Sequence, residues 1–455
     1  MPRQDLDAVP ETLTSGHSKP RVAVVGAGVA GLGASLALTE QGCDVALFEA
    51  FGQLGGHART VEIELDQLRF PVDTGFLVFN HRTYPHLLAL FKRLEVPTSP
   101  SDMSFAVSEG PHRFEWAGTN LRSVFAQPRN LFSTSFWRML FDILKFNKQA
   151  SALAIQIGND HDHVEWREPL ASFLARNNYS TAFRDQYLLP MAAAIWSCPM
   201  KKMLEFPLGS FVRFFHNHGL LLIENRPQWY TVTGGSQQYV RRIQTRLEDV
   251  RMSTPVLGVT RIMRDQHSRI AIASKAGTEF FDHVVLACHS DQSLKLLTDA
   301  SPSELALLRG VRYQANEAWL HTDIGLMPKS RTAWAAWNYM SDGNRGSPAV
   351  SVTYWLNKLQ PLPCTTPVLL SLNPLRPPSP EKLISRFGYE HPILDAESAE
   401  SVRNLPQVQG LNNTWFAGAW LGFGFHEDGL RSGIEAARGL MNSLTQGSEV
   451  FRHAA

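Results

Sequence analysis

The feature that most constrains this chain is a glycine-rich turn between a strand-like run and a helix-like run. The run RVAVV (21–25) is short and β-branched, as in buried parallel strands. It leads directly into GAGVAG, which places Gly26, Gly28 and Gly31 in the G-x-G-x-x-G spacing. The next residues predict a helix, and DVALFEA (44–50) predicts a second buried strand. This order of elements predicts a dinucleotide-binding βαβ unit.

Each glycine of this turn has a mechanical role in binding a diphosphate. Gly26 permits the tight turn, Gly28 lets the backbone approach a pyrophosphate, and Gly31 lets the helix pack closely on the strand. The helix N-terminus directs free N–H groups and a partial positive charge at the phosphates. Glu49 follows Gly28 by 21 residues, where an acid accepts hydrogen bonds from a ribose 2′-OH. We therefore expect a dinucleotide whose adenosine ribose carries no 2′-phosphate.

A second glycine pair, Gly55 and Gly56, follows in LGGHART (54–60). This stretch resembles the GGR-x-x-T motif of amine-oxidase-like and phytoene-desaturase-like flavoproteins, whose glycines bring the backbone close to the ribityl-phosphate of FAD. In that motif an arginine follows the glycines directly, whereas here His57 stands in that place and Arg59 comes two residues later. The resemblance implies FAD, with Arg59 as the candidate phosphate ligand. An ordinary Gly-Gly turn is the alternative.

The end of the chain supplies a matching element. TWFAG (414–418) predicts a strand, a glycine-rich loop follows, and a helix is expected to begin near 428–430. In FAD enzymes of this architecture a late helix directs its N-terminus at the flavin pyrimidine ring, where its dipole stabilises negative charge near N1. The expected cofactor contacts here are Gly418, Asp428, Gly429 and Leu430.

The resemblance covers nearly the whole chain. GFHEDGL (424–430) and RPQWYTVTGGS (226–236) are similar to segments of predicted NAD/FAD-binding oxidoreductases in the flavin-containing amine oxidase and phytoene desaturase superfamily. In that family the residue at Val256 contacts the adenine through its backbone. Monoamine oxidases have an acid directly after their late F-A-G-T, but Ala419 follows the glycine here, so Asp428 is the candidate substitute. The cysteine that links FAD covalently is also absent, and we expect noncovalent FAD.

The predicted fold class is α/β, with a Rossmann-type FAD-binding domain of the amine oxidase and glutathione reductase type and an inserted α+β substrate domain. The FAD-binding domain is expected to be discontinuous, over 20–80, 229–297 and 405–445. The substrate domain would comprise 81–228 and 298–404. The first 19 residues are polar, lack the apolar middle of a secretory signal, and predict a disordered leader.

Composition excludes several classes of function. With 44% apolar and 19% charged residues, the 455-residue chain has a globular composition. Its 43 basic and 42 acidic side chains give a net charge of +1, which leaves no electrostatic footprint for nucleic acid. Four scattered cysteines, none in a C-x-x-C pair, indicate reduced thiols and a cytoplasmic location. The histidine pairs at 161/163 and 216/218 lack further ligands, so we expect no metal site.

The segment WRMLFDILKFNK (137–148) predicts an amphipathic helix. Its apolar side chains share one face and its cations lie beside that face: Trp137, Leu140, Phe141 and Leu144, with Arg138, Lys145 and Lys148. Such a face either packs against a core or lies in a bilayer interface. Both alternatives stay open, and the second would add a peripheral contact with the inner face of the membrane.

Flavin chemistry predicts an enzyme that holds a C–H bond near flavin N5 and excludes water. Our leading hypothesis is an FAD-dependent oxidoreductase that desaturates a hydrophobic small molecule or lipid acyl chain. The resemblance adds an association with cyclopropane-type fatty acid synthases. The alternatives are an amine oxidase that uses oxygen, with Lys329 or Lys358 holding a water at N5, and a non-enzymatic FAD-stabilised scaffold or redox sensor. The redox partner and the exact substrate stay open.

The candidate catalytic residue is His426. It is the one side chain of loop 422–428 whose unperturbed pKa, about 6.5, allows it to exchange a proton near neutral pH. It could accept a substrate proton or orient Asp428 and the flavin, and the alternative is a packing role.

Overall fold

The computed structural model describes residues 19–110, 113–158, 160, 163–196, 200–264, 267–344 and 349–453. The expected leader therefore lies outside the described residues, apart from Lys19. The chain divides into two compact units, the first built from segments up to Gly56, from Arg241 to Arg309 and from Asn404 onward, and the second from 57–240 and 310–403. This division places 57–80 and 229–240, which we expected with the FAD-binding domain, in the second unit.

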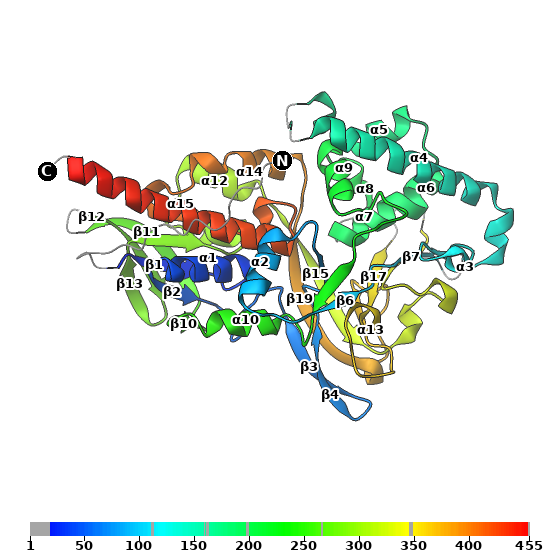
Figure 1. Ribbon diagram of the computed structural model, residues 1–455, viewed down its shortest axis with the longest axis horizontal. Helices are drawn as coiled ribbons and strands as arrows, with labels where there is room; N and C mark the ends of the chain where they lie inside the picture. The colour runs from blue at the N-terminus through cyan, green and yellow to red at the C-terminus, as the bar shows by residue number, and fades with distance from the viewer. Residues whose placement is uncertain are drawn as a thin grey trace. The chain divides into compact units, whose positions relative to one another are not determined.

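The first unit is built on a five-stranded parallel sheet in the order β10-β2-β1-β14-β20 (Figure 1). Its strands are β1 (Arg21–Val25), β2 (Asp44–Phe48), β10 (Asp249–Arg251), β14 (His283–Leu286) and β20 (Thr414–Phe416). The central strand β1 is apolar along nearly its whole length, because parallel strands are covered on both faces. The prediction of an α/β Rossmann-type fold is confirmed, and β1, β2 and β20 lie where the sequence predicted strands.

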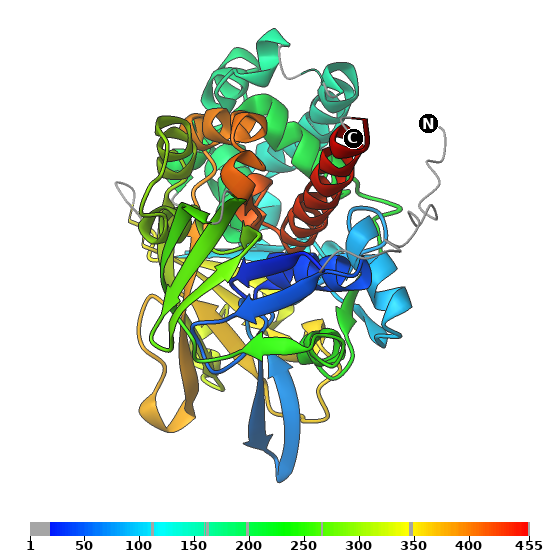
Figure 2. The same cartoon turned by 90° about the vertical axis from the view of Figure 1, so that its left-hand side faces the viewer.

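Two helices of the first unit lie side by side, α1 (Val29–Glu40) and α15 (His426–His453), as Figures 1 and 2 both show. Small residues allow this approach. A Cβ on Gly433 would lie 2.1 Å from the carbonyl oxygen of Ala30, and one on Gly33 would lie 2.6 Å from Leu430. The unit also contains an antiparallel sheet and two short helices: β11 (Val256–Arg264), β12 (His267–Ser274), β13 (Gly277–Phe281), α11 (Ser290–Leu296) and α12 (Pro302–Arg309).

The second unit contains a seven-stranded sheet in the order β19-β15-β18-β17-β16-β7-β8. Its strands are β7 (Phe105–Glu109), β8 (Phe114–Ala117), β15 (Tyr313–His321), β16 (Trp337–Ser341), β17 (Val350–Trp355), β18 (Leu369–Leu372) and β19 (Leu383–Pro392). All neighbours are antiparallel except β16 and β7. The unit also holds a β3–β4 hairpin (Thr60–Leu65 and Leu68–Asp73) and a small sheet of β5 (Phe79–Asn80), β6 (Thr98–Ser101) and β9 (Trp229–Val232).

A helical layer with an aromatic core completes the second unit. Its main helices are α2 (Pro85–Arg93), α3 (Leu121–Val124), α4 (Thr134–Ile157), α5 (Leu170–Arg176), α7 (Leu189–Trp196), α9 (Leu208–Asn217) and α14 (Ala396–Arg403). Phe146, Phe183 and Phe211 are fully buried, and the rings of Phe211 and Phe215 stack 4.3 Å apart. The helix predicted over 137–148 is part of α4. Among the described residues, no helix has the length and apolar character needed to cross a bilayer.

Candidate cofactor site

The turn after β1 has the geometry that a bound diphosphate requires. Gly26 has φ +100°, and a Cβ there would lie 2.9 Å from the carbonyl oxygen of Ala287. A Cβ on Gly31 would lie 1.8 Å from the carbonyl oxygen of Gly26, so neither position accepts a side chain. At Gly28, by contrast, no heavy atom lies within 4 Å of where a Cβ would be. Two glycines therefore close the turn and the third faces open space, which is the arrangement a phosphate cradle needs.

The second glycine pair lies against the first. Gly55 donates its N–H to the carbonyl of Ala27 at 2.8 Å, and Gly28 and Gly55 form a parallel bridge. Gly56 has φ +56°, and a Cβ on it would lie 3.2 Å from Gly28 Cα. The sequence predicted these pairs separately, and the structure joins them into one surface of exposed backbone. Such a surface fits the phosphates and the sugar of a dinucleotide.

Glu49 stands at the end of β2, beside the same turn. Its carboxylate is buried and accepts hydrogen bonds from the N–H groups of Ala27, at 2.8 Å, and Phe51, at 3.0 Å. These bonds fix the side chain, and each carboxylate oxygen keeps acceptor capacity for a ribose hydroxyl. Thr254 donates its N–H to the carbonyl of Glu49 at 2.8 Å. Val256 follows Thr254 by two residues, so this bond places Val256 near Glu49. The predicted ribose and adenine ligands thus lie in one region of the first unit.

The first turns of α1 and α15 are in direct contact. A Cβ on Gly429 would lie 2.7 Å from Val29 Cγ1, and the fully buried Leu430 packs over α1. Before the helix, Gly418 has φ +157° and donates its N–H to the hydroxyl of Ser432 at 2.9 Å. Two helix N-termini, each with partial positive charge, therefore lie side by side: that of α1 is expected to face the pyrophosphate and that of α15 the flavin pyrimidine ring. The sequence predicted each helix start but not their contact.

The side chain of Asp428 is engaged by the loop before α15. Its Oδ2 accepts N–H bonds from Phe423 at 3.0 Å and Phe425 at 3.1 Å, and its Oδ1 pairs with Arg431 at 3.2 Å. Burial raises the pKa of this carboxyl to about 6. Both oxygens thus hold the loop before α15. Asp428 as a cofactor ligand stays a prediction, with the backbone as the available route.

His426 is the first residue of α15 and is half-buried. Burial lowers the pKa of its imidazole to about 3. The ring is therefore neutral at physiological pH, as a proton acceptor must be, but it binds a proton only weakly. Its catalytic role stays a prediction. General bases work best with a pKa near the operating pH, so an imidazole with this low pKa would be a weak base for the reaction.

Arg59 and His57 belong to the second unit. The guanidinium of Arg59 lies 4.6 Å from the ring centroid of Phe387, and the ring of His57 lies 4.9 Å from that of Tyr389. The Nε of Arg59 is buried and has no hydrogen-bond partner among the described residues. A buried donor of this kind fits an anionic ligand. The predicted contact of Arg59 with the FAD phosphate remains a prediction.

The remaining candidates are engaged in other interactions. The ammonium of Lys358 pairs with Asp102 at 3.3 Å, and Lys329 is exposed. Burial lowers the pKa of His218 to about 4, and its Nδ1 lies 2.9 Å from the carbonyl oxygen of Phe214. His161 lies outside the described residues. Within the described part of the chain, no three His, Cys, Asp or Glu side chains are grouped so that they could hold a metal ion.

The sequence profile of the flavin containing amine oxidoreductases matches residues 29–441 of this chain. The chain belongs to this family. The predictions of FAD as the cofactor and of an FAD-dependent oxidoreductase are confirmed. The fingerprint glycines, Glu49 and the start of α15 form a site that fits this cofactor.

A curated relative matches about half of the chain. It is 28% identical over 233 residues to a Mycobacterium tuberculosis protein named "Putative flavin-containing monoamine oxidase AofH". That alignment covers 50% of this chain and 48% of the relative, so the chain spans about half the length of the curated relatives it matches.

Two solved structures share the fold at low sequence identity. The fatty acid isomerase from P. acnes that produces CLA has a TM-score of 0.64 and 15% identity, and the alignment covers 92% of this chain and 98% of the isomerase. Cyclohexylamine oxidase from Brevibacterium oxydans has a TM-score of 0.66 and 16% identity, with coverage of 94% and 100%. One is an isomerase of fatty acids and the other an oxidase of an amine, so the shared fold does not select the substrate.

Proposed function

We propose that this flavin-dependent oxidoreductase desaturates a hydrophobic substrate, a lipid acyl chain, and passes the hydride to bound FAD. The observation that carries the proposal is the difference between the two faces of the seven-stranded sheet in the second unit. Residues directly opposite one another in neighbouring strands share a face, so the strand register identifies each face. One face carries two adjacent rows without a charged side chain, with Ser341 and Glu109 in the row beyond them, and the other face carries a run of polar side chains at its centre.

The apolar face can be followed strand by strand. One row of paired residues comprises Phe387, Ala318, Leu372, Val352, Tyr339, Val107 and Trp116. The next row on the same face comprises Leu320, Leu370, Tyr354, Trp337 and Phe105. No charged side chain stands in either row. The opposite face carries Ser371, Thr353 and Asn338 at the centre of one row, which continues into Trp319 and Arg386 at one end and Ala106 and Ala117 at the other.

Within the second unit, the apolar face contacts Arg59 and Thr74. Arg59 lies over Phe387, and the hydroxyl of Tyr389, in the neighbouring row, is 2.9 Å from that of Thr74. The family motif implies that 55–59 lies at the ribityl-phosphate of FAD. An uncharged aromatic surface beside that segment suits an alkyl chain, which needs exclusion of water and no counter-charge. The alternative, that these side chains only pack a core, accounts for their burial equally well.

FAD, when bound, would supply the hydride acceptor at N5. Gly28 and the first turn of α1 would hold its diphosphate, and Glu49 its ribose. The first turn of α15 would face the flavin pyrimidine ring. The apolar sheet face would hold the substrate's C–H bonds away from water. Desaturation removes a proton as well as a hydride, and His426 is the candidate to accept that proton.

The second candidate function is oxidation of an amine. Two observations favour it: the similarity to the monoamine oxidase relative, and the perpendicular pair of Trp337 and Tyr354, whose ring centroids lie 4.8 Å apart. Aromatic faces attract ammonium groups. Against it, Lys358 already pairs with Asp102. The two apolar rows also offer no carboxylate to an ammonium substrate, and the carboxylate on the same face, Glu109, stands in the row beyond them.

Anaerobic reduction of the flavin distinguishes these functions. We expect purified protein to lose the yellow colour of oxidised flavin when mixed with saturated acyl lipids and to keep it with aliphatic amines or polyamines. Bleaching by amines alone would establish the second candidate. Bleaching by neither would support a scaffold or sensor and contradict both enzymatic proposals. Lipid analysis of cells with and without the protein would then identify the desaturated product.

The proton acceptor is tested by His426→Gln, which keeps a hydrogen-bonding side chain and removes the imidazole. If His426 accepts the proton, the rate of flavin reduction by lipid should fall by about 10²–10⁴-fold while FAD remains bound. The FAD content of the variant is the control. An unchanged rate at full FAD content would show that the proton leaves by another route.

A further inference from the structure

Large apolar side chains gather at the surface of the second unit, on α3, the 3₁₀ turn at Pro128–Phe132 and the first half of α4. We call this set the apolar patch: Leu121, Leu131, Phe132, Trp137, Phe141 and Leu144. All six are exposed. Phe132 is 89% exposed, the most of any large apolar side chain in the described part of the chain, and Phe141 is 63% exposed. Contiguous exposed apolar side chains of this kind mark an interaction site.

Half of the patch residues lie within the regular helix α4. Trp137, Phe141 and Leu144 follow one another at helical spacing, while Met139, Phe146 and Leu153 are buried on the opposite side of α4. The indole N–H of Trp137 donates to the carbonyl of Leu131 at 2.9 Å, which fixes the 3₁₀ turn to the helix. The ring centroids of Trp137 and Phe141 lie 6.5 Å apart. Of the two alternatives that the sequence left open for this face, core packing does not describe these side chains.

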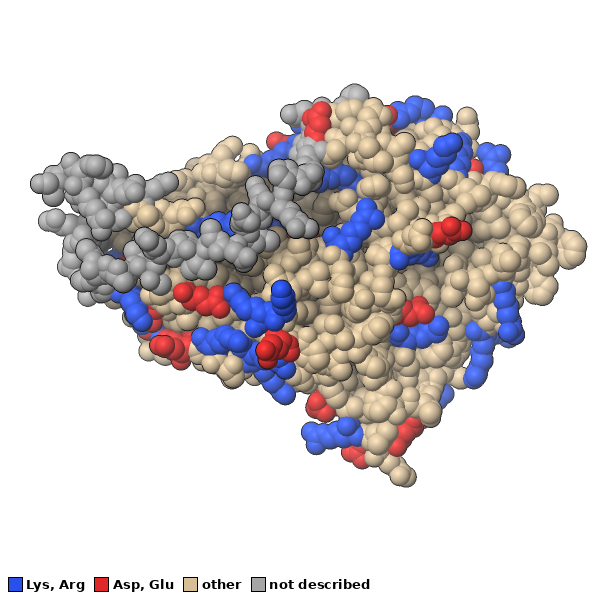
Figure 3. All heavy atoms as spheres, in the orientation of Figure 1, with Lys and Arg blue, Asp and Glu red and all other residues tan. Residues whose placement is uncertain are grey.

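The charge around the patch is positive. Residues 116–158 contain five cations, Arg122, Arg129, Arg138, Lys145 and Lys148, and one acid, Asp142, so this segment has a formal net charge of +4 in a chain whose total is +1. Asp142 is buried and pairs with Arg138 at 3.3 Å. Lys148 stands one helical turn beyond Leu144 on the same stripe. In Figure 3 the right-hand end of the molecule, where Figure 1 shows α3 and the start of α4, is tan with blue side chains below it.

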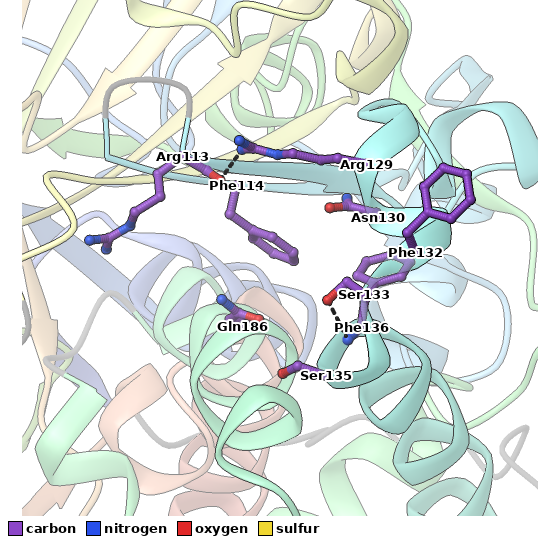
Figure 4. A pocket seen from close by; sticks show the side chains of 9 residues that line it. All are labelled: Arg113, Phe114, Arg129, Asn130, Phe132, Ser133, Ser135, Phe136 and Gln186. Carbon is purple, nitrogen blue, oxygen red and sulfur yellow. Dashed lines mark hydrogen bonds between the residues drawn. The ribbon is translucent and has the colours of Figure 1, made fainter.

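A pocket of about 330 Å³ opens beside Phe132. It is lined by Arg113, Phe114, Arg129, Asn130, Phe132, Ser133, Ser135, Phe136 and Gln186. Figure 4 shows Arg129 along one side, Phe132 and Phe136 on another, and the guanidinium of Arg113 pointing away from both phenylalanines. None of these nine described residues carries a carboxylate. Arg113 donates to the carbonyl of Gly343 at 2.8 Å, and Arg129 donates to the carbonyl of Arg113. Two arginines and the exposed Phe132 in the lining of one pocket suit a phosphate at the edge of an apolar phase.

We propose that the apolar patch docks on the surface of a bilayer that contains anionic phospholipid. The exposed aromatic and leucine side chains enter the boundary between headgroups and acyl chains, and the cations, with the Arg113–Arg129 pocket, face the headgroup phosphates. A bilayer offers apolar depth and negative charge together, which matches the combination found here. The proposal is independent of the proposed activity, because binding is measured without turnover.

The first experiment is sedimentation of the full FAD-loaded protein with vesicles of equimolar phosphatidylcholine and phosphatidylglycerol at low salt. We expect the protein to pellet with these vesicles, to bind phosphatidylcholine vesicles more weakly, and to be released as salt is raised. Phe132→Ser combined with Phe141→Ser should weaken binding about tenfold or more, since each phenylalanine loses its apolar burial. The matched control, Leu68→Ser combined with Ile384→Ser, removes two exposed apolar side chains elsewhere in the second unit and should bind like the wild type.

The second experiment tests the charge. Arg113→Gln, Arg122→Gln and Lys148→Gln together should weaken binding to the anionic vesicles by about fivefold per charge, roughly 100-fold in all. The control replaces three exposed cations outside the patch, Lys92, Lys275 and Arg309, by Gln and should change binding little. FAD content and thermal unfolding of every variant report whether it folds. The proposal is overturned if the wild type stays in the supernatant at low salt, if the patch variants bind like their controls, or if the patch instead holds two copies together on a sizing column.

Discussion

The two units of the chain use opposite kinds of residue to fix their surfaces. In the first unit, the decisive contacts depend on the absence of a side chain: α1 meets the turn after β1 at Gly31 and meets α15 at Gly433. In the second unit, the contacts depend on large rings, with Phe146, Phe183 and Phe211 fully buried in one cluster. Where two backbones touch, only glycine fits. An aromatic core, in contrast, tolerates different large side chains as long as their total volume is similar.

This difference decides how much of each unit's function can be predicted from the sequence. A glycine whose Cβ would overlap a carbonyl is required at one position and spacing, so the cofactor site leaves a recognisable motif. The apolar sheet face and the apolar patch are specified by residues that many other folds also use. The chemistry common to the family is therefore easier to identify from the sequence than the chemistry peculiar to this chain.

The largest effect should come from Gly31→Ala. A Cβ there would lie 1.8 Å from the carbonyl oxygen of Gly26, and neither backbone can move without separating α1 from β1. We expect a loss of about 3 kcal/mol or more of stability and no retention of FAD, measured by thermal unfolding and flavin content. Phe211→Leu is the counterpart in the second unit and should cost about 1–1.5 kcal/mol with FAD retained. Equal losses in the two variants would remove the contrast between the units.

The next effect separates folding from cofactor binding. Gly28→Val adds a side chain where no heavy atom of the chain lies within 4 Å, so the protein should fold, but the side chain would occupy the space of the pyrophosphate. We expect FAD affinity to fall by about 100-fold or more, equivalent to about 2.7 kcal/mol, with thermal unfolding of the apoprotein unchanged. Full FAD content in purified Gly28→Val would place the diphosphate elsewhere.

Much of the first unit was predictable because its signals are local. The strand at 21–25, the three glycines and Glu49 lie within 29 residues, and each follows from the geometry of one turn. The contact between Val29 and Gly429 was not predictable, since 400 residues separate the two and no local pattern records such a pairing. The hydrogen bonds from the N–H groups of Phe423 and Phe425 to Oδ2 of Asp428 were not predicted either, because no sequence pattern records them.

The second unit was less predictable for a physical reason. The periodicity of 137–148 identified an amphipathic helix correctly, but an apolar stripe has the same spacing whether it faces a core or the surface. Only the structure shows that Met139 and Phe146 face inward while Trp137 and Phe141 face outward. In the same way, alternation within a strand such as β17 does not reveal that the neighbouring strands extend one apolar row across all seven strands.

A smaller loss of FAD affinity is expected on changing Glu49. Hydrogen bonds from backbone N–H groups hold this side chain in place, and no glycine contact is involved. Glu49→Gln keeps the length of the side chain and one amide oxygen for the N–H of Ala27, but it removes the charge that a ribose hydroxyl would meet. We expect FAD affinity to fall by about 1–3 kcal/mol, or roughly 5- to 150-fold, measured by titrating apoprotein with FAD. Glu62→Gln, on the exposed β3–β4 hairpin, is the control and should bind FAD normally. A Glu49→Gln protein that binds as tightly as the wild type would show that the ribose is held by other groups.

The smallest effect should be common to both units, because each buries the same kinds of titrating group. Burial lowers the pKa to about 4 at His283 in the first unit and at His321 in the second. The folded state therefore binds fewer protons than the unfolded state, whose histidines titrate near 6.5, and stability should fall as pH drops below about 6.5. Burial raises the pKa of Asp73 and Asp428 to about 6, which opposes this loss below about pH 6 because the folded state then gains protons that the unfolded state lacks.

We therefore expect the thermal midpoint to fall by a few degrees between about pH 7 and about pH 5.5, less steeply in the lower part of that range. Replacing either histidine by Asn should reduce the acid sensitivity by a similar amount, since both lose the same penalty of charging a buried imidazole. The two variants are each other's control, because they lie in different units. If only His283→Asn reduced the sensitivity, acid would act on the first unit alone, and the units would differ in their response to pH as they do in their packing. A midpoint that rises on acidification would show that the carboxyls outweigh the histidines.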